Sequence, residues 1–128
     1  MEESGNRSEL FLRGLEHQKK VWGNKYTRPS IYEEIDPDLY RIVLEFVHGE
    51  ILSRPGLELK IRELLIVAVL TALGRPAETE LHIHGALNVG CSRQEITETI
   101  IQTGVYAGFP AMHSAVGIAK KVFDERGI

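Results

Sequence analysis

The stretch ETELHIHGALNVGC, residues 78–91, carries two of the five histidines, two glutamates and the only cysteine of the chain. Side chains of these types can bind a metal, exchange thiols or move protons. On a strand, His82 and His84 would share one face and could chelate a metal, whereas on a helix they point to nearly opposite sides. Helical spacing instead pairs Glu78 with His82 and Glu80 with His84.

Metal and thiol chemistry both lack a necessary partner. A catalytic metal usually needs three protein ligands, but no third ligand accompanies either helical pair, so we predict no bound metal. Cys91 precedes a capping serine, and a place near a helix N-terminus would lower the pKa of its thiol. Because no second cysteine exists, dithiol chemistry is excluded. We favour the interpretation that Cys91 is a small residue packed at a helix junction.

Glu63 is a candidate for acid–base work because its helical face is expected to be buried. Its neighbours on that face are all apolar: Leu59, Ile66, Val67 and Leu70. A buried carboxylate is costly unless it is paired or protonated, and both situations are common in active sites. The alternative is a structural ion pair with a histidine or arginine of a neighbouring helix.

The remaining candidates are one histidine and three arginines. His82 borders the inward face of its helix and can reach into a cleft, although a hydrogen-bonded core histidine is the alternative. Guanidinium groups bind carboxylates bidentately, so Arg54, Arg62 and Arg75 are candidate anion binders, with a surface position as the alternative for each. His17 is predicted to face solvent.

Composition excludes several classes of protein. The 128 residues are 43% hydrophobic and 26% charged with a net charge of −3, which is typical of a globular domain and not of a nucleic-acid binder with a basic stripe. The polar, acidic N-terminus is no signal peptide, and the apolar run LLIVAVL is too short to span a bilayer. With a single cysteine, we expect a cytoplasmic protein. From its net charge and its short apolar run, we expect that it binds neither nucleic acid nor membrane.

Apolar spacing and capping residues predict six helices. The first should run from Ser8 to Trp22, and the second should open at Asp36 and Pro37. Residues 24–35 between them should be irregular. The remaining four helices have expected boundaries at Gly74, Pro76, Gly90, the Ser92–Glu95 capping box, Pro110 and Gly127.

These elements predict an all-α protein with a single domain over residues 1–128, in which residues 1–7 form a frayed tail. The third helix, within residues 57–74, is apolar almost all round. Such a helix must be covered on every side, and six short helices do not provide that cover. We therefore expect the chain to form an oligomer.

Two segments resemble the carboxymuconolactone decarboxylase family: RPGLELKIRELLIVAVLTALGR, residues 54–75, and ELHIHGALNVGCSRQEITETIIQTGVYAGFPA, residues 80–111. RGLEHQKKVWG also resembles the N-terminal helix of that family, so the resemblance covers about residues 13–125. It implies the six-helix fold of alkylhydroperoxidase D and a homo-oligomer, either a trimer or a hexamer.

Alkylhydroperoxidase D, a relative of this family, uses a CxxC pair, a histidine and a glutamate. The two cysteine positions fall on Arg75 and Glu78, the histidine on His82 and the glutamate on Glu63. The proton-relay pair is thus kept while both thiols are absent. Thiol peroxidase activity of that type is not expected.

The resemblance implies a carboxy-lyase that decarboxylates a small butenolide dicarboxylate, such as 4-carboxymuconolactone, to the enol-lactone of 3-oxoadipate in aromatic catabolism. No cofactor is implied, because the unsaturated lactone itself accepts the electrons released with CO2. His82 would donate the proton and Glu63 would orient or recharge it. The implied substrate-binding residues are Arg54, Arg62, Arg75 and Glu78.

Some residues depart from the family pattern. Glu63 replaces a typical serine, Ala107 a common cysteine, and His84 and Gly85 the usual arginine and alanine. We therefore keep as an alternative a divergent alkylhydroperoxidase D-like oxidoreductase or lyase with another small substrate. A thiol-dependent peroxidase that uses Cys91 and a non-catalytic oligomeric binding protein are further alternatives.

Overall fold

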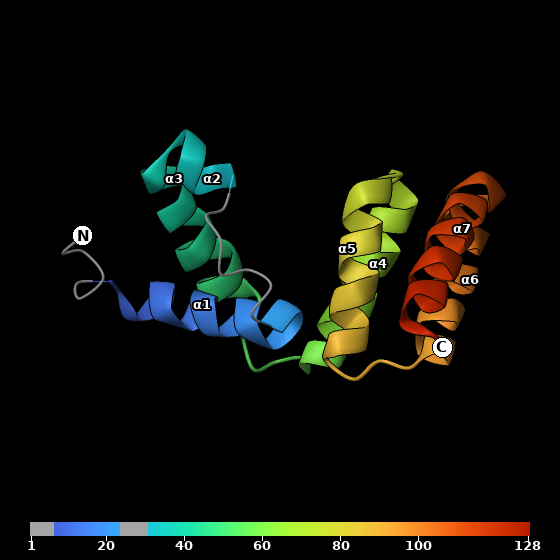
Figure 1. Cartoon of the computed structure of the whole chain (residues 1–128), viewed down its shortest axis with the longest axis horizontal. Coiled ribbons are helices and arrows are strands. Elements are labelled where there is room, and N and C mark those ends of the chain that lie inside the picture. The colour runs from blue at the N-terminus through green and yellow to red at the C-terminus, as the bar shows by residue number, and fades with distance from the viewer. Residues whose placement is uncertain (1–6, 24–30) are drawn as a thin grey trace. The chain divides into compact units, whose positions relative to one another are not determined.

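The structure is a computed structural model that describes residues 7–23 and 31–128, in which every regular element is a helix. The chain forms two compact units, Met1–Leu57 and Glu58–Ile128. The first holds helices α1 to η3 and the second holds α4 to α7 (Figure 1). The all-α prediction is confirmed for the described residues. None of their helices is long and apolar enough to cross a membrane.

Local capping accounts for the start of the first unit. Helix α1, Glu9–Trp22, has the predicted boundaries: the Ser8 hydroxyl accepts a hydrogen bond from the Phe11 amide, and Gly23 ends the helix at a φ of 65°. Helix α2, Ile31–Ile35, lies where irregular chain was expected. That prediction is wrong for these five residues, which form a single helical turn closed by a bond from Asp36 N to Tyr32 O. Residues 24–30 lie outside the described residues, as do residues 1–6 of the predicted tail.

The predicted second helix starts as expected but changes type midway. Helix α3, Pro37–Ile42, is capped by the Asp36 carboxylate and continues directly into a π-helix, η3, Val43–Ile51. Helix η3 packs closely on α1 because two glycines leave room for the neighbouring backbone. A Cβ at Gly14 would collide with Leu44 O, and a Cβ at Gly49 would collide with Leu10 O.

The second unit is a four-helix bundle that consists of α4, Leu59–Leu73, α5, Pro76–Asn88, α6, Arg93–Ala107, and α7, Phe109–Arg126. Helices α4 and α7 each pack against both α5 and α6. The predicted boundaries hold: Gly74 and Gly127 end their helices at left-handed φ, Pro76 opens α5, and Ser92 with Glu95 forms the capping box. The bundle core includes Val67, Ile83, Ala86, Ile96, Ile100, Val122 and Phe123.

Helix α4 buries a narrow stripe, Glu63, Val67 and Thr71, against the rest of the bundle. Other apolar side chains of this helix are 43–64% exposed in the single chain: Ile61, Leu65, Val69 and Leu73. The reason for expecting an oligomer therefore stands, and oligomerisation stays a prediction, as does a single domain over residues 1–128.

The close packing of α1 on η3 predicts that Gly49→Ala will destabilise the first unit by about 1–3 kcal/mol, because the added methyl group meets backbone that cannot move aside. Urea unfolding followed by the fluorescence of Trp22, the only tryptophan, measures this change. Gly117→Ala in α7 is the matched control, since nothing lies within 4 Å of its added Cβ. An unchanged midpoint for Gly49→Ala would contradict the prediction.

Candidate active site

Glu63 and His82 meet between α4 and α5. The Glu63 carboxylate is 1% exposed and the His82 side chain 16%, and His82 Nδ1 lies 2.8 Å from Glu63 Oε2. An ionised carboxylate can only accept hydrogen bonds, so His82 Nδ1 is the donor in this contact. The expectation that buried Glu63 has a partner is confirmed.

The helical hairpin explains why these two side chains meet. Gly74 ends α4 in a left-handed conformation and Pro76 begins α5 two residues later. This short turn brings the buried stripe of α4 against the inward face of α5. His82 comes just before buried Ile83, at the border of that inward face, where its ring can contact Glu63 and still reach the surface.

The second oxygen of Glu63 is also buried. Glu63 Oε1 has no hydrogen-bond partner among the described residues, and an unbonded buried acceptor costs roughly 1–3 kcal/mol. The catalytic role of Glu63 stays a prediction.

His84 contacts a different neighbour, as helical geometry predicted. Its Nδ1 accepts a hydrogen bond from Arg126 Nε at 3.0 Å, and its Nε2 lies 3.6 Å from a Glu125 oxygen. Arg126 also donates to Asn88 Oδ1, so this cluster attaches α5 to the end of α7. Within residues 7–23 and 31–128, no group of three or more histidine, cysteine, aspartate or glutamate side chains is placed to hold a metal.

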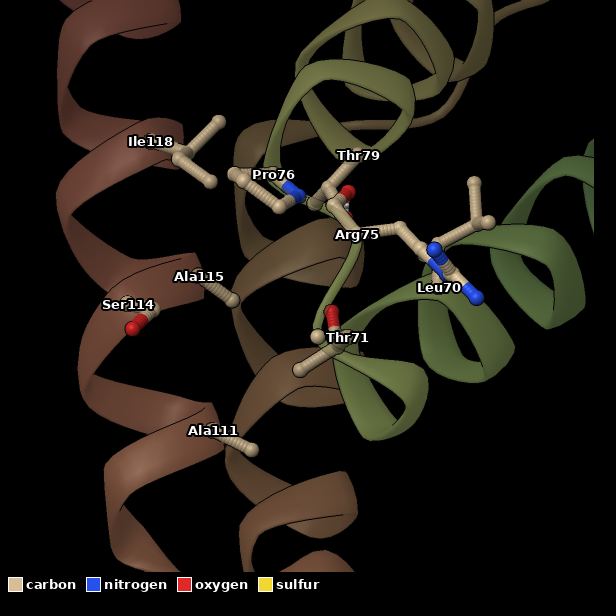
Figure 2. Close-up of a pocket in the computed structure, with 10 residues that line it drawn as sticks. Leu70, Thr71, Arg75, Pro76, Thr79, Ala111, Ser114, Ala115 and Ile118 are labelled. Atoms are coloured by element: carbon tan, nitrogen blue, oxygen red, sulfur yellow. Dashed lines mark hydrogen bonds between the residues drawn. The ribbon is translucent and has the colours of Figure 1, made fainter.

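The four predicted substrate-binding residues lie in three different places. Arg54 is exposed and belongs to the first unit. Arg62 is partly buried and directly precedes Glu63 on α4, while Arg75 and Glu78 are exposed at the start of α5. Arg75 also borders a pocket, although Figure 2 shows its guanidinium on the side away from α7. Their roles toward a substrate stay predictions.

Cys91 is buried, as expected for a small residue packed at a helix junction. Its side chain is 4% exposed, and Sγ contacts Lys60 O at 3.4 Å. Burial raises the pKa of the thiol to about 11, and the negative charge of Glu95 adds to this effect. The lowered pKa that a helix N-terminus could cause is not found, because the thiol is buried in the bundle. The structure thus supports the interpretation of a small residue at a helix junction.

His17 was predicted to face solvent, and this is wrong. It is 5% exposed, and its Nδ1 lies 3.2 Å from His48 Nδ1. The ring of Trp22 packs edge-on against His48. The sequence did contain a signal, because His17 shares helical spacing with three residues that are buried in α1: Phe11, Gly14 and Val21.

The fold and the site define an all-helical protein whose candidate catalytic pair comes from the two helices of one hairpin. A sequence profile of the Carboxymuconolactone decarboxylase family matches residues 37–121. The chain belongs to this family. The matched region begins in the first unit and extends through the second, so it includes Glu63 and His82.

Three individual proteins are similar to this chain. The 4-carboxymuconolactone decarboxylase of Acinetobacter baylyi is 35% identical over 125 residues, which are 96% of this chain and 93% of that protein. An uncharacterised 15.0 kDa protein of Paracoccus denitrificans is 37% identical over 95 residues, 73% and 71% of the two chains. The nitrosuccinic acid decarboxylase of Metarhizium robertsii is 28% identical over 118 residues, 91% and 82% of the two chains. Two of these relatives are therefore named as decarboxylases of different acids.

The environment of Cys91 predicts slow alkylation. At pH 8, iodoacetamide should modify the folded protein at least about a hundred-fold more slowly than the urea-unfolded protein, because the thiolate is the reactive form. Mass spectrometry after timed quenching measures both rates. Equal rates would show that the thiol is accessible and ionised in the folded protein.

The raised pKa of Cys91 also predicts how stability depends on pH. The thiol is held neutral in the folded protein, so its contribution to stability is complete below the ordinary thiol pKa near 9 and is lost as pH rises toward about 11. Cys91→Ala should remove this part of the alkaline decline. Urea midpoints of both proteins between pH 8 and pH 11 test the prediction, which fails if the two declines are parallel.

Proposed function

We propose that the protein is a carboxy-lyase that removes CO2 from a small carboxylated lactone of the 4-carboxymuconolactone type without a cofactor. The contact between His82 and Glu63 is the observation that carries the proposal. It supports the proposal because a histidine bonded to a buried carboxylate is suited to proton transfer. The chain is also similar over 96% of its length to a 4-carboxymuconolactone decarboxylase.

The residues suit the chemistry of such a substrate. The bond between carbon and the leaving carboxylate breaks, CO2 departs, and the electron pair enters the conjugated lactone, whose carbonyl oxygen takes up the negative charge. His82 Nε2–H then delivers a proton to carbon. Glu63 holds the ring through Nδ1 and balances its positive charge, and a solvent proton restores the starting state.

Substrate binding is the second requirement of this reaction. The substrate is anionic, and the proposed binding residues are Arg54, Arg62 and Arg75, with Glu78 beside His82 on α5. We further infer a homo-oligomer, trimer or hexamer, that acts in the cytoplasm in the β-ketoadipate pathway of aromatic catabolism. These statements rest on the family and not on a contact in the structure.

A second candidate substrate class is a nitro-substituted dicarboxylate. The similarity to a nitrosuccinic acid decarboxylase over 91% of this chain favours it. A nitro group next to a carboxylate accepts an electron pair as the unsaturated lactone does, so the same histidine and glutamate would serve. A thiol-dependent peroxidase is less well supported, because the raised pKa of Cys91 disfavours the reactive thiolate.

The proposed role of His82 predicts that His82→Ala lowers kcat by about 10²–10⁴-fold, because general acid catalysis contributes this much. Glu63→Gln keeps the size of the side chain but removes its charge and should lower kcat by at least about ten-fold. Lactone absorbance and CO2 release measure turnover. His113→Ala, an exposed histidine on α7, is the matched control and should retain wild-type activity.

Each outcome of this experiment is informative. Wild-type protein that consumes neither 4-carboxymuconolactone nor nitrosuccinate would contradict decarboxylation of both proposed classes. Turnover of nitrosuccinate alone would replace the first substrate class with the second. Full activity of His82→Ala on either compound would remove the proposed proton donor.

A further inference from the structure

Two histidines contact each other in the core of the first unit. His17 on α1 is 5% exposed and His48 on η3 is 9% exposed, and their Nδ1 atoms lie 3.2 Å apart. A contact of this length between two ring nitrogens is a hydrogen bond, in which one Nδ1 donates and the other accepts. At least one of the two rings must therefore be neutral.

Close backbone packing brings the two rings together. A Cβ at Gly14 would collide with the backbone of η3, and a Cβ at Gly49 would collide with the backbone of α1. Gly14 lies about one turn before His17, and Gly49 directly follows His48. Both rings are therefore buried as long as α1 lies against η3, and they reach water when the two helices separate.

The charges carried by the surrounding helices are exposed or engaged elsewhere. Within the described residues, the charged side chains nearest to the pair along α1, α3 and η3 that face solvent are Arg13, Glu16, Lys19, Lys20, Arg41 and Glu50. Glu45 is partly buried, and its carboxylate accepts hydrogen bonds from Ser8 and Arg41. Since solvent screens the exposed charges, burial and the closeness of the two rings govern the cost of charging the pair.

We propose that the His17–His48 pair is a pH-sensitive contact, which holds α1 on η3 at neutral pH and releases it when both rings become protonated. One added proton is tolerated, because a charged ring still donates through Nδ1 to its neutral neighbour. A second added proton removes the acceptor and places two like charges in the core, with the two Nδ1 atoms 3.2 Å apart. The proposal does not depend on the proposed function.

The direction of the pH dependence follows from counting protons. When α1 separates from η3, both rings reach water and can take up protons at the ordinary histidine pKa of about 6.5. The open form then binds more protons than the packed form, so the contribution of the pair to stability is complete above this pH and is lost as the pH falls below it. For one extra proton, the open population rises about ten-fold per pH unit.

Trp22 can report the release of α1. Its side chain is 7% exposed, and its ring packs against His48 with the ring centroids 6.2 Å apart. An indole that reaches water emits at longer wavelength. The fluorescence of the full chain should therefore shift to longer wavelength between pH 7 and pH 5, and it should return when neutral pH is restored.

Asparagine substitutions test whether the pair causes this shift. An asparagine amide places a hydrogen-bonding atom near the position of Nδ1 but does not ionise. In His17→Asn and in His48→Asn, the remaining histidine can be protonated and still donate to the amide oxygen, so each folded variant should lose the shift. His113→Asn, which replaces an exposed histidine on α7, is the matched control and should shift as wild type does.

Amide hydrogen exchange of the wild-type protein makes the test independent of the variants. After correction for the pH dependence of chemical exchange, the protection of α1 should fall by about ten-fold per pH unit below pH 6.5. The protection of α4 and α6 in the bundle should not follow it. The proposal is overturned if the wild-type emission does not shift, if a folded asparagine variant shifts as wild type does, or if α4 and α6 lose protection in parallel with α1.

Discussion

The hydrogen bond between Glu63 Oε2 and His82 Nδ1 is the interaction on which the candidate active site depends. The Glu63 carboxylate is 1% exposed, and burying its charge costs several kcal/mol, which only a well-aligned partner offsets. The two helices must therefore keep one register. Gly74 and Pro76 enforce it, since one ends α4 and the other starts α5 with almost no intervening chain.

Helix α5 is held from two sides by neighbouring histidines. His82 contacts Glu63 on α4, and His84 accepts a hydrogen bond from Arg126 on α7. A rotation of α5 about its axis would break both contacts at once. His82 thus belongs to a pair that is suited to proton transfer. His84 belongs to a cluster that holds α5, the helix that carries His82, in position.

The sequence predicted what depends on local chemistry. Ser8, Gly74 and the Ser92–Glu95 capping box act within a few residues of their own helix ends, so the boundaries could be read directly. The need of Glu63 for a partner was predictable because a charge among apolar neighbours is visible in the sequence. The choice of His82 as that partner required the family resemblance, since the packing of two helices is not a local property.

One prediction failed locally, at Ile31–Ile35, where a helical turn stands in place of irregular chain. The failure at His17 concerns tertiary packing. The contact of His17 with His48 arises only because α1 lies against η3, and a π-helix leaves no distinct pattern in so short a segment. For Cys91 the favoured interpretation of a packed small residue agrees with the structure, because burial decides the pKa of its thiol. The substrate-binding roles of Arg54, Arg62 and Arg75 stay predictions, because the sequence pattern does not assign a guanidinium its partner.

Under the proposed function, the residues of the candidate active site restrict which acids the protein can decarboxylate. The family resemblance implies that Arg75 and Glu78 stand where alkylhydroperoxidase D carries its thiols. Cys91 is buried, and its pKa is raised. Proton transfer through His82 and Glu63 is then the chemistry that this site can offer. Such a site can release CO2 only from an acid whose own structure accepts the electron pair. An unsaturated lactone and a nitro group both meet that condition, so the proposed proton transfer is compatible with either substrate class.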